Sequence, residues 1–383
     1  MSTDSHELVE ISEGKAKILV PKSERKSKGP GKIDAPVFYN PAMAHNRDIS
    51  VIVLQAFVEL RGRRVDVLDG MAASGVRGIR FCKEIEGDFS VTINDWSEES
   101  HSLIQKNIER SWCSNAVASN RDLNNLLGEK SFDYIDIDPF GTAVPFIDNA
   151  VRAVRHKGIL AITTTDTATL CGSGALPCIR RYGAKPMQCD FMHEVGLRIF
   201  AGYVVRTAAK YDRAARPLLC YADGHYMRCY FEILDGAKRA DALLLEMGYA
   251  HLNMETRARK ISSVSSCRKP WKSAGPLWIG KMFDAEFLET ISEPREMMEK
   301  KDVARLFSIW KEEADAPPLY YTTAELSSVF RVDPPPVLEL IDKLRSNGFF
   351  ASKTHFSPMG VKTDAPLEKI GKILRQKPNR NQA

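Results

Sequence analysis

The sequence predicts an α/β protein with a mostly parallel sheet covered by helices, followed by a second, smaller α+β domain. Short apolar strands alternate with helical segments from residue 65 to about 165, a pattern typical of a parallel sheet with helices on both faces. The chain has 383 residues, more than one ordinary core accommodates. After residue 236 the composition becomes more helical and more basic, so we expect domains at 1–236 and 237–383.

The first domain is expected to begin with an irregular basic segment. Residues 12–36 are rich in Lys, Ser, Gly and Pro, which favours a lead-in without regular structure. A helix should follow, because Val51, Leu54 and Val58 fall on one helical face. The alternating elements are then expected as helix 47–60, strand 65–68, helix 78–85, strand 90–94, helix 98–110, strand 132–137, helix 148–155 and strand 158–164.

Two further patterns stand in the second half of the chain. Residues 218–234 predict a β-hairpin with its turn at 222–225, because aromatic and basic side chains alternate after that turn. Beyond the expected domain boundary come helices at 323–330 and 334–346 and then a hairpin at 349–358. This order resembles a winged helix, although a small α/β domain would give a similar pattern.

The composition restricts the class of protein. A hydrophobic content of 44% and a charged content of 27% are typical of a soluble globular protein. No apolar run approaches the ~20 residues that span a bilayer, and residues 1–10 resemble no signal or transit peptide. None of the 8 cysteines shows Cys-x-x-Cys spacing, so we expect reduced thiols and no metal site. These features predict a cytoplasmic protein without a membrane partner.

Basic residues gather in three segments, although the net charge is only +5. Residues 15–32 hold seven bases and one acid, residues 257–272 six bases and no acid, and residues 353–383 seven bases and two acids. Such segments can neutralise phosphates and so bind nucleic acid without sequence information. A solvated surface or a loose tail explains any one of them equally well, whereas three together favour a polyanionic partner.

Three carboxylates are expected where parallel strands end, and ligands of open α/β sheets bind at this edge. Asp69, Asp95 and Asp138 each follow a predicted strand. Aspartate is common after strands and often caps the next helix. The joint placement of the three therefore indicates a site more strongly than any one of them.

The segment from Asp69 to Gly78 has the composition of a ligand-binding loop. Its small residues let a ligand approach the backbone and the free N–H groups of the following helix. It lacks the G-x-G-x-x-G and G-x-x-x-x-G-K-[ST] spacings, which disfavours dinucleotides and triphosphates. A ligand with a carboxylate and no phosphate fits better, because Arg77 or Arg47 could pair with that carboxylate. S-adenosylmethionine is such a ligand.

Two later positions suit the nucleoside part of the same ligand. Asp95 follows the second strand of the alternation, where an acid usually accepts hydrogen bonds from ribose hydroxyls. Asp122 could accept a hydrogen bond from an adenine amine, with Leu123 against the ring. Each position alone is also explained by an ordinary turn or helix cap.

The most specific motif is the segment 136–141, Asp-Ile-Asp-Pro-Phe-Gly, at the end of a buried strand. An aromatic amine is a weak nucleophile, and a carboxylate such as Asp138 can accept one of its protons as a methyl group arrives. The Pro139 carbonyl could accept the second hydrogen, and Phe140 could stack on the base. Alternatively, Asp138 caps a helix and Phe140 fills a core. Asp136 points to the opposite face of the strand and is expected to be structural.

Blocks of the chain match one known family in order from end to end. They lie at 37–41, 46–48, 68–80, 94–95, 136–141, 165–166, 170–172, 193–196, 223–228 and 354–358. On these blocks the chain resembles the tRNA (guanine-26-N2) dimethyltransferases, especially the archaeal form.

The resemblance implies a class I S-adenosylmethionine-dependent methyltransferase domain with a Rossmann-like sheet, followed by a C-terminal domain that helps to hold tRNA. It implies that Asp138 acts as general base and that Phe38 and Phe140 flank the target guanine. Some relatives bind zinc through cysteine clusters that this chain lacks, so zinc is not expected. The residues implied to contact S-adenosylmethionine are Arg47, Arg77, Asp95, Asp122 and Leu123.

The sequence therefore predicts methylation of N2 of guanine 26 in tRNA, in two successive transfers. One alternative is the same chemistry on another base amine in RNA or DNA. A second is a nucleic-acid-binding protein with an inactive catalytic domain, which the intact motif around Asp138 disfavours. A dinucleotide-dependent dehydrogenase is disfavoured by the missing glycine spacing.

Overall fold

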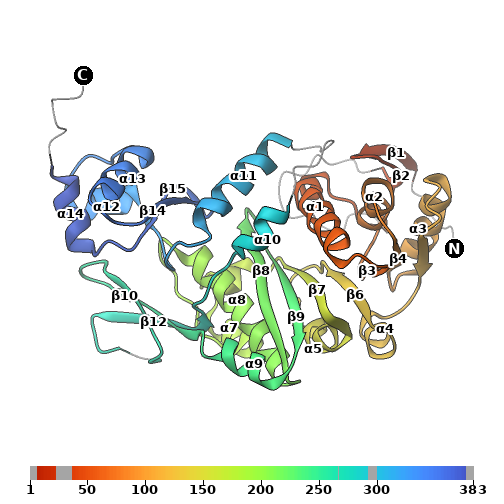
Figure 1. The fold of residues 1–383 in the computed structure, drawn as a ribbon, viewed down its shortest axis with the longest axis horizontal. Helices are drawn as coiled ribbons and strands as arrows, with labels where there is room; N and C mark the ends of the chain where they lie inside the picture. Colours follow the sequence, from red (N-terminus) through yellow and green to blue (C-terminus); the bar gives the residue numbers. More distant parts are fainter. Residues whose placement is uncertain (1–6, 23–36, 266, 292–299, 377–383) are drawn as a thin grey trace.

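A seven-stranded sheet forms the centre of the protein (Figure 1). The computed structural model describes residues 7–22, 37–265, 267–291 and 300–376. The strand order is β5-β4-β3-β6-β7-β9-β8, and only β9 runs antiparallel to its neighbours. The strands are β3 (Val65–Asp69), β4 (Phe89–Asn94), β5 (Ala116–Ser119), β6 (Phe132–Ile137), β7 (Val154–Thr164), β8 (Arg213–Asp223) and β9 (Tyr226–Asp235).

Helices cover both faces of this sheet, so the central strands are buried on both sides. All six residues of β6 are buried, and its two aspartates, Asp133 and Asp136, are both paired with arginines. Helix α1 packs on α2, and α5 packs on α4 and α8 on the opposite face (Figure 1). The helices are α1 (Ala44–Arg61), α2 (Val76–Glu84), α3 (Glu98–Arg110), α4 (Leu123–Glu129), α5 (Val144–Ala153), α6 (Thr167–Leu170), α7 (Ala175–Tyr182), α8 (Met192–Ala209) and α9 (Ala237–Leu244).

The predicted alternation of strands and helices is confirmed, and so is the hairpin of β8 and β9. Two elements between 116 and 129, β5 and α4, were not predicted, because both are too short, at 4 and 7 residues, to show a clear period. Helix α5 begins at Val144, four residues before the predicted start, with a proline in its first turn.

The expectation of an irregular lead-in over residues 12–36 is wrong for residues 12, 13 and 16–21, which lie in strands. Strands β1 (Leu8–Glu13) and β2 (Ala16–Pro21) form an antiparallel hairpin, with Gly14 at a φ of 54° in the turn. Ala16, Ile18 and Val20 are buried on one face of β2, while lysines occupy the rest of the segment and hide this alternation. The bases at 25, 26, 28 and 32 lie outside the described residues.

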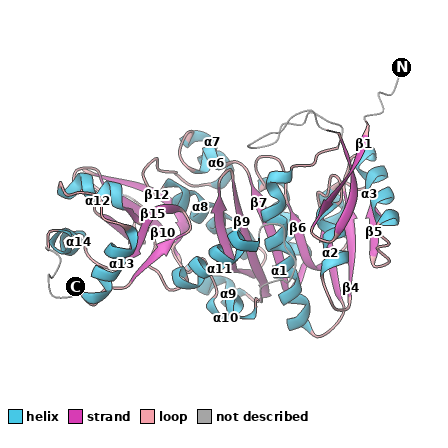
Figure 2. Cartoon of the chain, turned by 90° about the horizontal axis from the view of Figure 1, so that it is seen from above, coloured by secondary structure: helices cyan, strands magenta, loops and turns pink. Residues whose placement is uncertain are grey.

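Most of the C-terminal elements lie at the end of the molecule opposite β5 (Figure 2), whereas residues 285–290 and 300–313 pack beside the central sheet and α1. A second apolar core begins at Tyr321, whereas the first core continues past residue 237 to Tyr320. The division into domains at 236 and 237 stays a prediction. The elements are β10 (Met247–Asn253), β11 (Arg259–Ser262), β12 (Trp271–Trp278), α10 (Ala285–Thr290), α11 (Lys300–Glu313), β13 (Tyr321–Thr322), α12 (Thr323–Phe330), α13 (Val337–Ser346), β14 (Ala351–Thr354), β15 (Ser357–Thr363) and α14 (Leu367–Leu374), with the short 3-10 helix η1 (Pro41–Met43) before α1.

Among the described residues, no helix combines the length and the apolar character needed to cross a membrane.

Candidate active site

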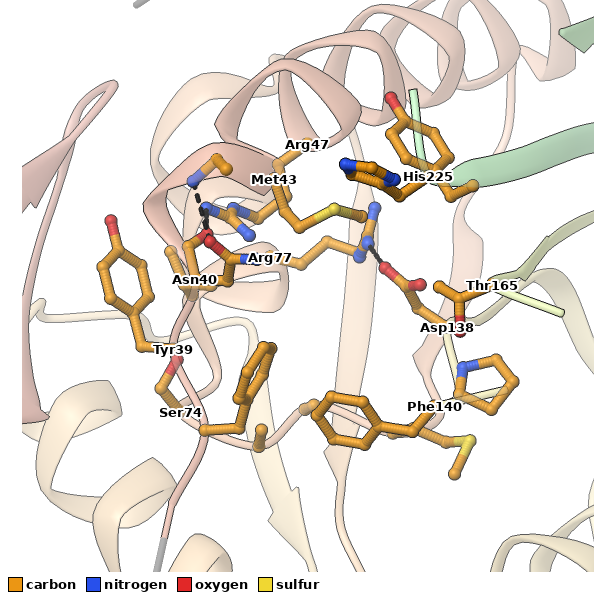
Figure 3. A pocket seen from close by; sticks show the side chains of 18 of the residues that line it. Tyr39, Asn40, Met43, Arg47, Ser74, Arg77, Asp138, Phe140, Thr165 and His225 are labelled. Carbon is orange, nitrogen blue, oxygen red and sulfur yellow. Dashed lines mark hydrogen bonds and ion pairs between the residues drawn. The ribbon is translucent and has the colours of Figure 1, made fainter. Parts of the chain in front are cut away.

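A cavity of about 340 Å³ opens at the carboxyl ends of the parallel strands (Figure 3). Asp69 ends β3 and pairs in register with Asp136 of β6, so the residue that follows β6 lies at the same edge of the sheet. This confirms that the strand ends bring Asp69 and Asp138 to one cavity. The lining comprises Phe38, Tyr39, Asn40, Ala42, Met43, Arg47, Asp69, Met71–Ser74, Val76, Arg77, Asp138, Pro139, Phe140, Thr165 and Asp223–Tyr226.

Asp138 faces this cavity with one carboxylate oxygen available. Its Oδ2 accepts a hydrogen bond from Arg77, and its side chain is 20% exposed. Within the described part of the chain, no donor bonds to Oδ1. Arg77 is held in turn by Asn46 Oδ1 at 2.9 Å and by Ser50 Oγ at 2.5 Å. The ion pair therefore orients the Asp138 carboxylate without removing it from the cavity.

Asp136 is enclosed in the core beneath the cavity. The expectation that it points to the opposite face from Asp138 is wrong, because residues two apart on a strand share a face and Arg77 contacts both carboxylates. Arg228 donates to Oδ1 at 3.3 Å and to Oδ2 at 2.5 Å, and both side chains are fully buried. Tyr134 adds a third hydrogen bond at 3.3 Å. Since its charge is paired inside the core, Asp136 stabilises the fold and is not available to a ligand.

Phe38 and Phe140 meet at the mouth of the cavity. Their ring centroids are 4.6 Å apart with an interplanar angle of 79°, an edge-to-face contact. Phe140 is 53% exposed, which is unusual for a large apolar side chain. The two predicted flanking rings are thus brought together, with one of them open to an incoming aromatic group.

The loop from Asp69 to Gly78 packs closely on the sheet. Asp69 Oδ2 accepts a hydrogen bond from the Gly78 N–H at 2.9 Å, and burial raises the pKa of Asp69 to about 7. A Cβ on Gly78 would lie 2.6 Å from the side chain of Ile93, so only glycine lets α2 come this near. The loop backbone therefore forms one wall of the cavity.

A smaller hollow of about 180 Å³ adjoins the cavity at Met71, which lines both. Asp95 accepts hydrogen bonds there from the N–H groups of Ala73 at 2.8 Å and Ser97 at 3.0 Å. A carboxylate has about four acceptor positions, so Asp95 can still accept from a ligand. The hollow is lined by Gly70, Met71, Asn94, Asp95, Trp96, Arg121, Asp122, Leu123 and Phe146.

Asp122 and Leu123 lie in this hollow at the start of α4. Asp122 Oδ1 caps the helix by accepting a hydrogen bond from the Asn125 N–H at 3.0 Å. No donor among the described residues bonds to the other carboxylate oxygen, Oδ2. Leu123 is buried. Trp96, which is 75% exposed, and Phe146 also line the hollow, and no sequence pattern predicts either of them as a site residue.

Arg47 has a strong partner that the sequence did not reveal. Glu13 of β1 accepts from Arg47 Nε at 2.6 Å and from Nη2 at 2.5 Å, and the Asn40 carbonyl accepts from Nη2 at 3.0 Å. Burial alone would raise the pKa of Glu13, but Arg47 and Arg80 outweigh it and the pKa is lowered. Arg47 therefore reaches the cavity as part of an ion pair, and its role toward a ligand stays a prediction.

A sheet in this order, with a glycine-containing loop after β3 and a carboxylate at the end of β4, is the architecture of class I S-adenosylmethionine-dependent methyltransferases. The residues present fit that cofactor. Asp95 offers acceptors to ribose hydroxyls, Asp69 offers a buried carboxylate near positive groups, and the small residues between them leave the backbone accessible.

The particular family follows from comparison with known proteins. The chain belongs to the family described as N2,N2-dimethylguanosine tRNA methyltransferase, whose model matches residues 14–375. It is 40% identical to the tRNA (guanine(26)-N(2))-dimethyltransferase of Pyrococcus abyssi over 96% of this chain and 99% of the relative. It is 36% identical to the enzyme of that name from Methanobrevibacter smithii, over 97% of this chain and 98% of the relative.

A solved structure agrees with this assignment. Trm1 from Pyrococcus horikoshii in complex with S-adenosyl-L-methionine superposes with a TM-score of 0.87 at 35% identity, covering 96% of this chain and 100% of that one. The predicted family, the class I fold and S-adenosylmethionine as the cofactor are thereby confirmed.

Proposed function

We propose that this protein transfers methyl groups from S-adenosylmethionine to N2 of guanine 26 in tRNA, twice, to give N2,N2-dimethylguanosine. Family membership and the names of the relatives support the substrate. The observation that carries the chemistry is Asp138, whose Oδ1 faces the cavity without a described donor while Arg77 holds Oδ2.

Asp138 acts as the general base. The N2 lone pair of guanine is delocalised into the ring, so nitrogen becomes nucleophilic only as its proton is drawn away. Oδ1 accepts one N–H, and the Pro139 carbonyl accepts the other. As the N–C bond forms, the proton passes to Asp138.

Phe38 and Phe140 hold the base in line. In the free protein their rings touch edge to face, and a splayed-out guanine would enter between them. Stacking on aromatic rings is sequence-tolerant, so these residues fix the plane of the base, while hydrogen bonds select it.

The cofactor supplies an electrophilic methyl group on its sulfonium. We assign Asp95 to the ribose hydroxyls, and Asp122 and Leu123 to the adenine, because these residues share the smaller hollow. Asp69, Arg77 and Arg47 line the larger cavity beside it and are assigned to the amino-acid part.

The C-terminal domain, residues 237–383, is proposed to hold tRNA. Its order of α11, β13, α12, α13, β14 and β15, with sheet order β13-β15-β14, resembles a winged helix. Exposed bases lie near it on β11 and β12 and on α14.

The test is mass spectrometry of an unmodified tRNA transcript incubated with the purified protein and S-adenosylmethionine. We expect N2,N2-dimethylguanosine at position 26, and no incorporation into a transcript with adenine there. Undiminished incorporation into the adenine transcript would refute the proposal in favour of another base amine.

A further inference from the structure

One wall of the cavity has no part in the chemistry described so far. Residues 223–226, the turn between β8 and β9, line the cavity together with Asp138 and Phe140. The turn reaches this edge because β9 pairs with β7, placing Met227 opposite Thr164, and β7 is the neighbour of β6. In Figure 3 the Arg77–Asp138 pair lies between His225 and Phe140.

Within its own domain the turn is held through Asp223. Its Oδ2 is 3.1 Å from His45 Nδ1 and accepts from the Tyr226 hydroxyl at 3.3 Å. His45 stands at the start of α1, so this contact ties the turn to the helix that carries Asn46 and Arg47.

A second hold comes from the C-terminal domain. His355, in the turn between β14 and β15, accepts a hydrogen bond on Nε2 from the Ala222 N–H at 3.3 Å. Its Nδ1 lies 2.7 Å from Glu313 Oε2, and its side chain is 1% exposed. Because Nε2 accepts, the ring proton is on Nδ1 and is donated to Glu313. Each ring nitrogen thus serves a different domain.

The C-terminal side of this link is rigid. Glu313 also accepts from Thr354 Oγ1 at 2.8 Å and lies 3.3 Å from Lys362 Nζ, which in turn bonds to Glu194 of α8 at 2.8 Å. These ionic side chains are at most 3% exposed. Apart from Glu194 Oε2, which has no hydrogen-bond partner among the described residues, the groups of this buried network are paired. Such a network has few alternative arrangements, so the position of His355 is fixed relative to both domains.

We propose that His355 is a positioning residue for methyl transfer, through which the C-terminal domain fixes the cavity wall formed by residues 223–226. The kinetic part of this inference rests on the proposed function. The cavity therefore reaches its working shape only with the C-terminal domain docked, and a segment far from Asp138 in the sequence contributes to the reaction without touching the base.

Two substitutions separate the two bonds of the imidazole. His355→Asn keeps an N–H near the position of Nδ1 and loses the acceptor for Ala222. His355→Gln places an acceptor near the position of Nε2 and loses the donor to Glu313. If His355 acts by holding the turn, His355→Asn should be the more damaging for catalysis, whereas a purely structural role predicts that loss of the buried bond to Glu313 is worse.

The readouts are amide hydrogen exchange of residues 222–226 and steady-state methylation of tRNA. For His355→Asn we expect amide exchange of the turn to accelerate by about tenfold and kcat to fall by about tenfold, because the variant loses about the free energy of one hydrogen bond. The KM for the cofactor should change little. For His355→Gln we expect both quantities to stay within about threefold of the wild type. Equal loss of kcat in the two variants, or a larger loss in His355→Gln, would overturn the proposal.

A variant on the other side of the bond covers the case in which both His355 substitutions prevent folding. β8 is an edge strand, and the Ala222 N–H points to His355, so Ala222→Pro removes this donor at a site where proline is tolerated. It should reproduce the loss of kcat of about tenfold that is expected of His355→Asn, and an unchanged kcat would overturn the proposal. Hydrogen exchange does not require activity, so a wild type that fails to methylate guanine 26 refutes the proposed function separately.

Discussion

Asp138 and Asp136 are two residues apart and should respond to the same substitution in opposite ways. Asp138→Asn keeps the shape of the side chain but removes the base that takes the amine proton. General-base catalysis contributes ~10²–10⁴-fold, or about 3–5 kcal/mol of activation free energy, and we expect kcat to fall by that factor.

The structure predicts little loss of stability from Asp138→Asn. Arg77 keeps its hydrogen bonds to Asn46 and Ser50 and lies 3.5 Å from Asp136, so its charge stays compensated. The amide oxygen can still accept from Arg77, and the free energy of unfolding should change by about 1 kcal/mol or less.

Asp136→Asn is the matched control. It leaves the Arg228 guanidinium, which is fully buried, without the carboxylate that accepts from both its nitrogens. Breaking a buried ion pair costs about 3–5 kcal/mol of stability, so the thermal unfolding midpoint should drop clearly. Circular dichroism for unfolding and single-turnover methylation of tRNA measure the two effects. If Asp138→Asn kept more than about a tenth of the wild-type rate, or unfolded as early as Asp136→Asn, the assignment of the two carboxylates would be wrong.

Three further predictions concern the base, the cofactor and the tRNA. Phe140→Ala should lower kcat/KM by a factor that corresponds to ~1–3 kcal/mol, the free energy of stacking one base on an aromatic ring, and Phe140→Tyr should lower it much less. Equal loss in both variants would show that the base does not stack on this ring. Because burial raises the pKa of Asp69 to about 7, its ionisation opposes folding as pH rises through that value, yet the anion attracts the cations of S-adenosylmethionine. The dissociation constant of the cofactor, measured by calorimetry, should therefore fall as pH rises through about 7 in the wild type, and a similar fall in Asp69→Asn would contradict this. Binding of tRNA should weaken steeply as the salt concentration rises, while cofactor binding should hardly change. The slope of log K against log[salt] should become smaller by about three when four exposed bases are replaced by Gln, namely Lys260, Arg268, Lys269 and Lys272. An unchanged slope would place the tRNA elsewhere.

The parts of the site that follow strand geometry were predictable from the sequence. Alternation of apolar strands and helices predicts a parallel sheet, and parallel strands bring their carboxyl ends to one edge. This rule alone places Asp69 and Asp138 in one cavity. The different roles of Asp138 and Asp136 do not follow from the period of two, because residues two apart on a strand share a face; they follow from depth, since Arg228 encloses Asp136 inside the core while Asp138 stands beyond the end of β6.

The parts that depend on contacts between distant segments were not predictable. Glu13 meets Arg47 only because the hairpin of β1 and β2 folds onto α2 and α3, and no local pattern signals that approach. The sequence predicts a turn at 222–225, but the place of this turn in the cavity depends on the antiparallel pairing of β9 with β7. Its contact with His355 spans 133 residues of sequence, too far for any periodicity to report.

Charge counted along the sequence misplaces the basic surface for the same reason. Lys362 is paired with Glu194 and Glu313 in the interior, and Arg257 and Arg259 are both paired with Glu325. A base that is neutralised by a fixed carboxylate releases no counterion when a phosphate approaches, so it adds little to nucleic-acid affinity.

What remains of the second and third basic segments is a smaller, better-defined set of exposed bases. They stand on β11, on β12 and the segment before it, and on α14, all at the end of the molecule that carries the second core (Figure 2). These exposed bases support the proposal that tRNA is held by the C-terminal part, whereas the proposed site of methyl transfer lies at the edge of the central sheet. Binding of tRNA at one end and methyl transfer at the other require that the two parts of the protein keep a fixed position relative to one another. The buried link from Glu194 through Lys362 and Glu313 to His355 holds the two parts together.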